Sequence, residues 1–221
     1  MSSPLRIAVL ASGRGSNLQA LIAARDAGTL PVEFVLVGSD KANAGALELA
    51  EAAGIARLVL NPKAYPSRRA FDLELFARIE ASGADLLVLA GYMRILDGEA
   101  LHPWVGRMIN IHPSLLPKYR GLHTHRRALE AGDAEHGASV HYVTAELDGG
   151  PVIAQARIGI EAGDHEDLLA QRLLAYEHRL LPAVVRLIAA GRLAYAAPDS
   201  VALDGERLSA PLELRGDDLA R

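Results

Sequence analysis

Apolar residues in the first ninety positions form two kinds of pattern that follow each other along the chain. Mostly apolar runs at 6–11, 32–39, 57–60 and 86–90 predict strands, and the first, second and fourth of these are expected to be buried. Apolar residues at helical spacing over 18–27, 44–53 and 67–82 predict helices, and each of these segments is followed directly by a glycine. This alternation of strands and helices predicts a parallel sheet with crossover helices.

The pattern changes after residue 91. We expect a short helix over 97–105, a buried strand ending at 108–111, a loop over 115–121 and a helix over 123–131. Strands at 139–143 and 151–160 are joined by a short turn, which favours an antiparallel pair. A long helix is expected from 164 or 165 through 175, bent or broken near Pro182 and continuing to 190, and the tail at 193–221 reads as a peripheral hairpin with a frayed end.

These elements predict an α/β fold: a Rossmann-like, mostly parallel open sheet with helices on both faces and antiparallel strands in the C-terminal part. No repeat or low-complexity linker divides the chain, so we expect one domain over residues 1–221. Within it we distinguish an N-terminal phosphate-binding half (about 1–105), a C-terminal catalytic half (about 106–195) and a peripheral tail (about 196–221).

Composition narrows the class of protein. Hydrophobic residues make up 50% and charged residues 23% of the chain, which is typical of a globular enzyme-like domain. The net charge of −4 gives no overall positive field for nucleic acid or a membrane surface. The absence of cysteine excludes disulfides, thiolate catalysis and cysteine-bound metals. With no signal-peptide layout and no apolar stretch of membrane-spanning length, we expect a cytoplasmic protein.

The segment 109–117 places polar side chains among apolar ones at the end of a predicted strand. Asn110 and His112 are two positions apart, so their side chains point to the same side of the sheet at its carboxyl edge, where open α/β sheets bind ligands. An amide there can stabilise an oxyanion and an imidazole can move a proton, which suits chemistry at a carbonyl group. The alternative for His112 is a purely structural histidine.

Asp148 lies in a turn, Leu147-Asp148-Gly149-Gly150-Pro151, whose glycines allow a close backbone approach. Beside His112, its carboxylate would raise the imidazole pKa and favour the cation. The alternative is that this aspartate only forms the turn.

The segment 12–18 joins a predicted strand to a predicted helix. Gly15, Ser16 and Asn17 would offer backbone N–H groups to an anion at the helix N-terminus. Leu18 stands where a dinucleotide fingerprint has its third glycine, so a monophosphate fits better than a dinucleotide. The alternative is a tight turn in which Ser16 or Asn17 caps the helix.

Other polar residues have weaker patterns. Four histidines raise the question of a metal site: His123, His125, His136 and His141. No acidic residue lies close to the first pair, and the alternative is that these side chains form a polar wall or cap a helix. We therefore expect no bound metal. Arg68 and Arg94 are candidates for binding anionic groups, with Arg94 at a second strand end. Glu177 could hold an amine or a ribose hydroxyl, or lie on a solvated helix face.

These segments together resemble the phosphoribosylglycinamide formyltransferases of purine synthesis, nearly end to end. The resemblance rests on residues 12–20, 91–96, 110–119, 121–126 and 146–151. The Asn-x-His strand end and the later Asp are shared with the wider formyltransferase fold, which includes methionyl-tRNA formyltransferase and formyltetrahydrofolate hydrolase. The Gly-Ser-Asn turn and the Gly-Leu-His-Thr-His segment are typical of the ribonucleotide enzymes.

The resemblance implies transfer of a formyl group from 10-formyltetrahydrofolate to the amine of glycinamide ribonucleotide, without a metal. It also implies a monomer or weak homodimer whose partners are these small molecules, with no binding to nucleic acid or membranes. It places the ribonucleotide phosphate at Gly15, Ser16 and Asn17 and the ribonucleotide near Glu177. Leu174 and Arg120 depart from the family pattern, which is polar at the first and often proline at the second. The implied folate site comprises Arg68, Met93, Arg94, Ile95, Leu96, Asn110, Thr144, Ala145, Glu146, Leu147 and Asp148.

In the implied mechanism the amine attacks the formyl carbon directly. Asn110 and a cationic His112 stabilise the oxyanion, and Asp148 keeps His112 charged. Three alternatives stay open: a formyltetrahydrofolate hydrolase, a tRNA formyltransferase, and a nucleotide-binding or folate-sensing module without activity. The hydrolases have an added domain before the catalytic one and the tRNA enzymes usually have one after it, and this sequence predicts neither.

Overall fold

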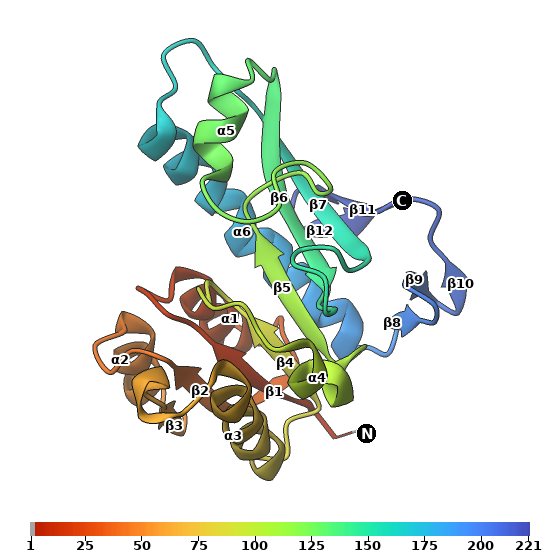
Figure 1. Cartoon of the computed structure of the whole chain (residues 1–221). Helices are drawn as coiled ribbons and strands as arrows, with labels where there is room; N and C mark the ends of the chain where they lie inside the picture. Colours follow the sequence, from red (N-terminus) through yellow and green to blue (C-terminus); the bar gives the residue numbers. More distant parts are fainter. Residues whose placement is uncertain (1–2) are drawn as a thin grey trace.

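The computed structural model describes residues 3–221 (Figure 1). Its helices are α1 (Ser16–Asp26), α2 (Gly45–Ala52), α3 (Arg68–Ala81), α4 (Gly98–Leu101), α5 (Thr124–Glu130) and α6 (Glu166–Ala189), with 3₁₀ turns η1 (Pro62–Ala64) and η2 (His102–Trp104). Its strands are β1 (Leu5–Leu10), β2 (Val32–Ser39), β3 (Arg57–Val59), β4 (Leu86–Leu89), β5 (Met108–His112), β6 (Glu135–Tyr142), β7 (Val152–Gly159), β8 (Leu193–Ala196), β9 (Ser200–Leu203), β10 (Glu206–Arg207), β11 (Leu212–Arg215) and β12 (Asp218–Ala220).

One nine-stranded sheet runs through both halves of the chain in the order β12-β11-β7-β6-β5-β4-β1-β2-β3. The strands from β3 to β5 are parallel, as alternating strands and helices require. β6 is antiparallel to both β5 and β7. The expected mostly parallel open sheet with antiparallel strands in the C-terminal part is therefore confirmed, and β5 is the strand at which the pairing changes.

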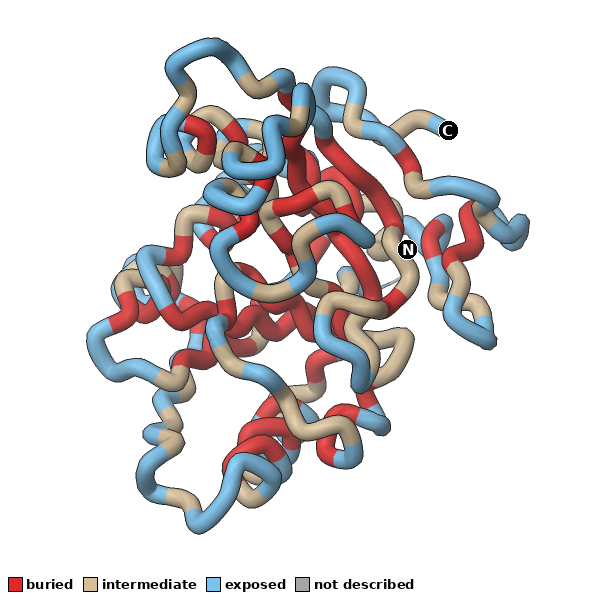
Figure 2. The backbone as a smooth tube through the Cα atoms, turned by 45° about the horizontal axis from the view of Figure 1, so that its top comes forward, coloured by how far each residue is buried: buried red, intermediate tan, exposed pale blue. Residues whose placement is uncertain are grey.

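The central parallel segments 7–10 of β1 and 86–89 of β4 are apolar and buried at every position because both faces of the sheet are covered there. In β1, Ile7 and Val9 pack into the core that includes α1 and α6, while Ala8 and Leu10 pack into the core that includes α3 and α4. All four are fully buried, and each large apolar side chain contributes about 1.5–3 kcal/mol through burial. Figure 2 shows this buried centre, with exposed segments confined to the periphery.

Helix α6 runs through Pro182 without a break. A proline inside a helix costs roughly 3 kcal/mol because it removes one backbone hydrogen bond. Leu180, Leu181, Val184 and Val185 flank it and are all completely buried. Burial of these side chains on both sides of Pro182 therefore stabilises the continuous helix. Helix propensity, which depends on local sequence only, does not include this stabilisation.

The interpretation of the tail as a peripheral hairpin with a frayed end is wrong. Strands β8, β9 and β10 form a small three-stranded antiparallel sheet, and β11 then joins the main sheet parallel to β7. Leu212 pairs with Ala154 and is 1% exposed. The free edge of β7 offers unpaired backbone groups, and β11 satisfies them. Across residues 3–221, no helix is long and apolar enough to cross a membrane.

Candidate active site

Three adjoining cavities lie where the carboxyl ends of β1, β4 and β5 meet the loops that follow them. We call them the loop cavity (about 100 Å³), the central cavity (about 410 Å³) and the turn cavity (about 680 Å³). The loop cavity is lined by Leu89, Tyr92, Arg94, Ile95, Leu96, Leu101, Asn110, His141 and residues 143–148. The central cavity is lined by residues 91–95, 110–113, 121–125, Leu147, Asp148 and Glu166. The turn cavity is lined by residues 13–17, Ala90, Gly91, Met93, Pro113, His125, Asp167, Ala170, Gln171, Leu174 and Glu177.

The central cavity connects the other two. It shares Asn110 and Asp148 with the loop cavity, and it shares Met93 and His125 with the turn cavity. The polar strand end of β5 therefore lies between two spaces with different linings: one under the 143–148 loop, and one at the start of α1.

The amide of Asn110 is oriented by a neighbouring strand. In the β5–β6 pairing Asn110 lies opposite His141, and Asn110 Nδ2 is 3.1 Å from His141 Nε2. His141 Nδ1 donates to the Tyr142 carbonyl at 2.9 Å, so Nε2 is left as the acceptor for the Asn110 N–H. This bond fixes one amide hydrogen and leaves the second free to donate to a ligand.

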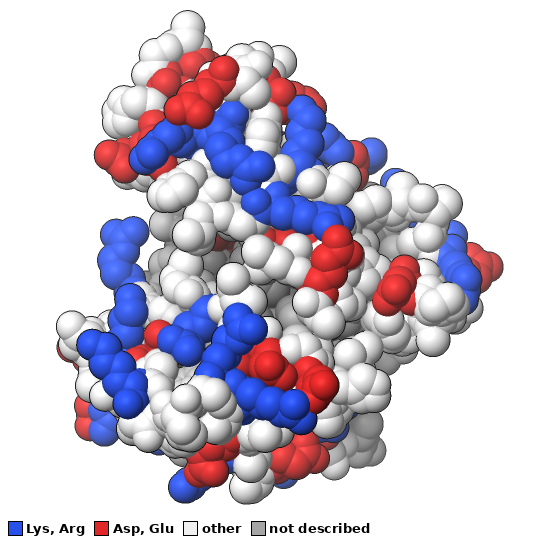
Figure 3. Space-filling model, in the orientation of Figure 1, with Lys and Arg blue, Asp and Glu red and all other residues white. Residues whose placement is uncertain are grey.

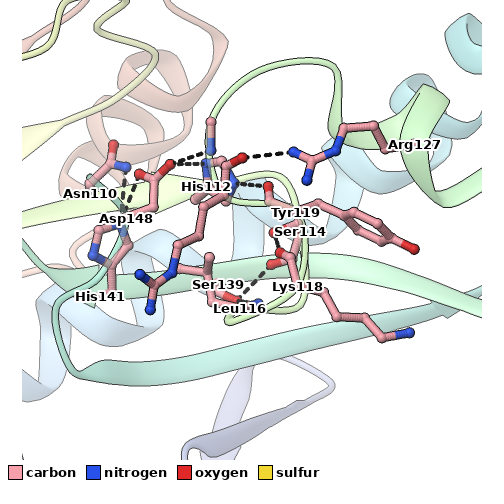
Figure 4. Close-up of polar contacts among 12 residues, drawn as sticks. Asn110, His112, Ser114, Leu116, Lys118, Tyr119, Arg127, Ser139, His141 and Asp148 are labelled. Carbon is pink, nitrogen blue, oxygen red and sulfur yellow. Dashed lines mark hydrogen bonds and ion pairs between the residues drawn. The ribbon is translucent and has the colours of Figure 1, made fainter. Parts of the chain in front are cut away.

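His112 lies between two acceptors (Figure 4). Its Nε2 donates to the Tyr119 carbonyl at 3.0 Å, and its Nδ1 is 3.5 Å from Asp148 Oδ2. Asp148 Oδ1 is 3.6 Å from His141 Nε2, so the carboxylate lies between the two imidazoles. The structure thus brings Asn110, His112 and Asp148 together from segments 36 residues apart in the chain.

The turn that contains Asp148 needs its particular sequence. Asp148 adopts a left-handed conformation (φ 47°), which aspartate tolerates better than most residues, and its Oδ2 accepts the Gly121 N–H at 2.8 Å. A Cβ at Gly150 would lie 2.0 Å from the Tyr142 carbonyl oxygen. Glycine at 150 therefore allows the backbone approach that holds the carboxylate in place.

Burial and neighbouring groups shift the pKa values of Asp148 and His112. It raises the pKa of Asp148, but the adjacent His141 and His112 imidazoles and the Gly121 N–H outweigh this and hold that pKa below its usual value. Burial also lowers the pKa of His112, and the Asp148 charge and the Tyr119 carbonyl oppose this without reversing it. In the unliganded protein the loss of hydration therefore works against the cationic form of His112, and the Asp148 charge works in its favour.

Buried hydroxyl and amide groups hold the loop that supplies the Tyr119 carbonyl. Ser139 Oγ donates to the Ser114 carbonyl at 2.7 Å and accepts the Leu116 N–H at 3.0 Å. Gln155 Nε2 donates to the Leu116 carbonyl at 2.9 Å. The polar face of β6 and β7 thus anchors the segment after β5, which positions the partner of His112.

The turn before α1 is shaped by a glycine. Gly15 has φ 82°, and a Cβ there would lie 2.8 Å from atoms of Ala46, so only glycine fits. Asn17 Nδ2 donates to Glu177 Oε2 at 2.8 Å, while the buried Asn17 Oδ1 has no protein partner. Burial raises the pKa of Glu177, opposed by the Asn17 bond. The turn cavity therefore offers both a free acceptor and a carboxyl group with suppressed ionisation.

Most of the residues named from the sequence line these cavities. Nine of the implied folate residues line the loop cavity, while Met93 lines the central and turn cavities instead. Arg68 lines none of the three, because it is the exposed first residue of α3. Of the two departures from the family pattern, Leu174 lines the turn cavity, and Arg120 forms an ion pair with Glu146. The nine implied folate residues that line the loop cavity are Arg94, Ile95, Leu96, Asn110, Thr144, Ala145, Glu146, Leu147 and Asp148.

The histidines do not form a metal site in residues 3–221, where no group of three or more suitable side chains could hold a metal ion. His125 Nδ1 and His136 Nε2 are 3.0 Å apart and form a buried pair. Burial lowers the pKa of His136 to about 4. His123 precedes α5 in a left-handed conformation and lines the central cavity, in keeping with a polar wall.

Two features of the site were missed by the sequence reasoning. His141 contacts Asn110 because β6 pairs with β5, a pairing that was not predicted although the strand itself was. Arg14 and Gln171 line the turn cavity. Arg14 belongs to the Gly-rich turn, so its position next to Gly15 was a signal that could have found it.

The open α/β sheet thus has an amide and an imidazole at the end of β5 with a carboxylate beside them, a set of groups that suits chemistry at a carbonyl group. The model of the formyl transferase family matches residues 5–185, and the chain belongs to that family. The phosphoribosylglycinamide formyltransferase of Escherichia coli is 50% identical over 204 residues, covering 92% of this chain and 96% of that protein.

Solved structures of other proteins are also similar to this chain. The phosphoribosylglycinamide formyltransferase of Coxiella burnetii superposes with a TM-score of 0.89 at 48% identity, covering 93% of this chain and 96% of that one. Glycinamide ribonucleotide transformylase 1 of Symbiobacterium toebii gives a TM-score of 0.88 at 45% identity, covering 92% and 95%.

Proposed function

We propose that this enzyme transfers the formyl group of 10-formyltetrahydrofolate to the primary amine of phosphoribosylglycinamide, in purine biosynthesis. The observation that carries the proposal is that Asn110, His112 and Asp148 line the central cavity, which connects the cavity under the 143–148 loop with the cavity at the start of α1. A formyl donor in one cavity and an amine acceptor in the other would meet at these three side chains. The names of the relatives support the same assignment.

The loop cavity suits the ring system of the folate. Its lining includes apolar side chains from β4, from the loop after β4, from α4 and from the 143–148 segment, next to polar groups such as Asn110 and Thr144. Flat heteroaromatic rings bind in such spaces because apolar walls exclude water while a few polar groups fix the orientation. The formyl group on N10, one methylene away from the ring system, would then lie within reach of Asn110. The apolar residues are Leu89, Ile95, Leu96, Leu101 and Val143.

The turn cavity suits the phosphorylated acceptor. The α1 N-terminus at Ser16 favours an anion, and Gly15 lets the backbone approach it closely. The free Oδ1 of Asn17 and the carboxyl group of Glu177 can accept hydrogen bonds from hydroxyl groups or an amine of the same ligand.

In the proposed reaction the amine nitrogen attacks the formyl carbon, and negative charge develops on the formyl oxygen. The second Nδ2 hydrogen of Asn110 donates to that oxygen, and its direction is set in advance by the bond to His141. Because the protein donor is already oriented, little reorganisation is needed when the charge appears.

The attacking nitrogen must lose a proton and the departing folate nitrogen must gain one. A neutral His112 can accept the proton at Nδ1, since the lowered pKa leaves that nitrogen free. Protonation then gives both ring N–H groups an acceptor, the Tyr119 carbonyl and Asp148. The imidazolium is stabilised there until it returns the proton to the leaving nitrogen, which restores the enzyme.

We further propose that both halves act as one domain in this reaction. The turn cavity comes from the N-terminal half and α6, the catalytic side chains come from β5 and the 144–150 loop, and one sheet connects them.

The test is a formyl-transfer assay that follows tetrahydrofolate formation from 10-formyltetrahydrofolate with and without phosphoribosylglycinamide. We expect release of tetrahydrofolate that depends on the ribonucleotide, with equimolar formylated product. Release without it would mean that water is the acceptor and the enzyme is a hydrolase. Release only with charged initiator tRNA would assign the tRNA reaction, and binding without turnover would make the chain a ligand-binding module.

A further inference from the structure

We propose that Arg14 is a specificity-determining residue of the turn cavity that binds the phosphate dianion of a phosphomonoester. This inference rests on the proposed function, because it assigns one end of the acceptor to one end of the cavity. It goes beyond the backbone turn by adding a side-chain cation that decides whether a phosphorylated ligand is preferred.

The charges around the turn cavity are distributed unevenly. Asp167 lines its α6 side, together with Glu177, whose carboxyl group has a pKa raised by burial. Burial lowers the pKa of His125, which favours the neutral imidazole. Arg14 is the sole lysine or arginine among the residues that line this cavity. A phosphate dianion would therefore be repelled from the α6 wall and attracted to the opposite end, where Arg14 lies.

The Arg14 guanidinium is not used within the protein. Arg6, Arg25 and Arg57 each pair with a carboxylate. Within residues 3–221, Arg14 forms no such ion pair and no side-chain hydrogen bond, and it is exposed to the cavity opening. An arginine with free donors can bind a phosphate in a bidentate manner, a contact that a lysine cannot reproduce.

The backbone of Arg14 is held firmly even though its side chain is free. The Ala46 N–H donates to the Gly13 carbonyl at 3.1 Å, and a Cβ at Gly45 would lie 3.2 Å from the Arg14 carbonyl oxygen. The turn is thus packed against the start of α2. The Arg14 side chain therefore extends from a rigid backbone position next to the N-terminus of α1, so the guanidinium and the helix N-terminus can bind the same anion.

A second observation shows that this end of the cavity is built for a ligand. Asn17 is 7% exposed, and its Oδ1 is buried in the cavity wall without a partner. A buried acceptor of this kind is costly unless a ligand donates to it. A hydroxyl group next to a phosphate would do so while the phosphate contacts Arg14. Figure 3 shows Lys and Arg side chains on both sides of the hollow at the centre of the face, in keeping with anionic ligands.

The experiment compares the wild type with Arg14→Met, Arg14→Lys and the control Lys63→Met. Lys63 is exposed on η1 and lies outside the three cavities, so its variant removes the same charge elsewhere. Titration calorimetry measures binding of ribose 5-phosphate and of ribose, and the formyl-transfer assay measures KM and kcat for each substrate.

We expect Arg14→Met to lower the affinity for ribose 5-phosphate and to raise the KM for the ribonucleotide by roughly 10- to 100-fold, the effect of a lost charge-assisted bond. The kcat and the KM for the formyl donor stay within about twofold, Arg14→Lys recovers part of the loss, and Lys63→Met changes nothing. The affinity for ribose, which has no phosphate, is the same in wild type and variant.

An Arg14→Met enzyme that binds ribose 5-phosphate within twofold of wild type would overturn the inference. So would an equal loss for ribose, since the effect would then not concern the phosphate. Failure of the proposed function is distinguishable, because a wild type without ribonucleotide-dependent transfer can still bind ribose 5-phosphate in an Arg14-dependent manner.

Discussion

The catalytic cluster and the turn cavity differ in how fully the protein satisfies its own polar groups. Around His112 and Asp148 the ring nitrogens and carboxylate oxygens have protein neighbours, from the Tyr119 carbonyl to the Gly121 N–H. In the turn cavity, Asn17 Oδ1 has no partner and Arg14 has no counterion among the described residues. The side chains of His112 and Asp148 therefore have protein partners in the absence of a ligand, whereas the turn cavity has polar groups without a partner.

This difference separates two tasks. A group that stabilises a transition state must be oriented before charge develops, so its partners belong to the protein. A group that binds a substrate contributes most if its donors and acceptors are left for the ligand. Substitutions in the first region should therefore lower kcat, and substitutions in the second should raise KM.

The largest effect should come from Asp148→Asn. Asparagine also tolerates the left-handed conformation of residue 148 and can still accept the Gly121 N–H, so mainly the charge is lost. The imidazolium at His112 then lacks its anionic neighbour, and we expect kcat to fall by about 10³-fold or more with the ribonucleotide KM nearly unchanged. Steady-state kinetics measure both. Asp133→Asn, outside the three cavities, is the control, and unchanged turnover in Asp148→Asn would refute the role of the carboxylate.

Asn110→Ala should come next. It removes the oriented N–H donor, and the loss of one oxyanion donor costs about 10²–10³ in rate. We expect that loss in kcat, with both KM values within a few fold, from the same kinetics. Asn43→Ala, an exposed asparagine outside the cavities, should behave as wild type. A variant whose KM rises while kcat is spared would move Asn110 from the catalytic to the binding region.

Asn17→Ala and Gly15→Ala test the turn cavity. The first removes the donor to Glu177, and the second forces a Cβ to within 2.8 Å of Ala46. We expect the ribonucleotide KM to rise about tenfold for Asn17→Ala and further for Gly15→Ala, with kcat less affected. Isothermal titration with the ribonucleotide checks the affinities. If the folate affinity fell instead, the phosphate is wrongly placed.

The last prediction concerns stability rather than kinetics, at the pair formed by His125 and His136. The pKa of His136 is lowered from 6.5 to about 4, so the folded state binds its proton more weakly than the unfolded state. The free energy of unfolding should therefore fall as pH drops from about 6.5 toward about 4, by roughly 3 kcal/mol from this residue.

His136→Gln should flatten that part of the profile, measured by urea denaturation at a series of pH values. His165→Gln, at the exposed start of α6, is the matched control and should keep the wild-type slope. Identical slopes in wild type and His136→Gln would contradict the assignment.

Local patterns were enough to predict most elements. Apolar runs gave the buried parallel strands, and glycines marked the helix ends, because periodicity and backbone preference are local properties. Strand ends and Gly-rich turns also placed Asn110, His112, Asp148 and Gly15 at ligand-facing positions, because loops at the carboxyl edge of such a sheet must converge. The resemblance of these motifs to one family supplied the substrates.

Tertiary structure decided what depends on partners distant in sequence. The pairing of β6 with β5 brought His141 to Asn110, and burial lowered the pKa of His112 although an aspartate lies beside it. β11 joined the main sheet, and Arg14 lines the turn cavity while Arg68 lines none of the three cavities. Desolvation and long-range pairing depend on the whole packed chain, so the sequence determined which groups the site contains, and the fold determined their charge and their neighbours.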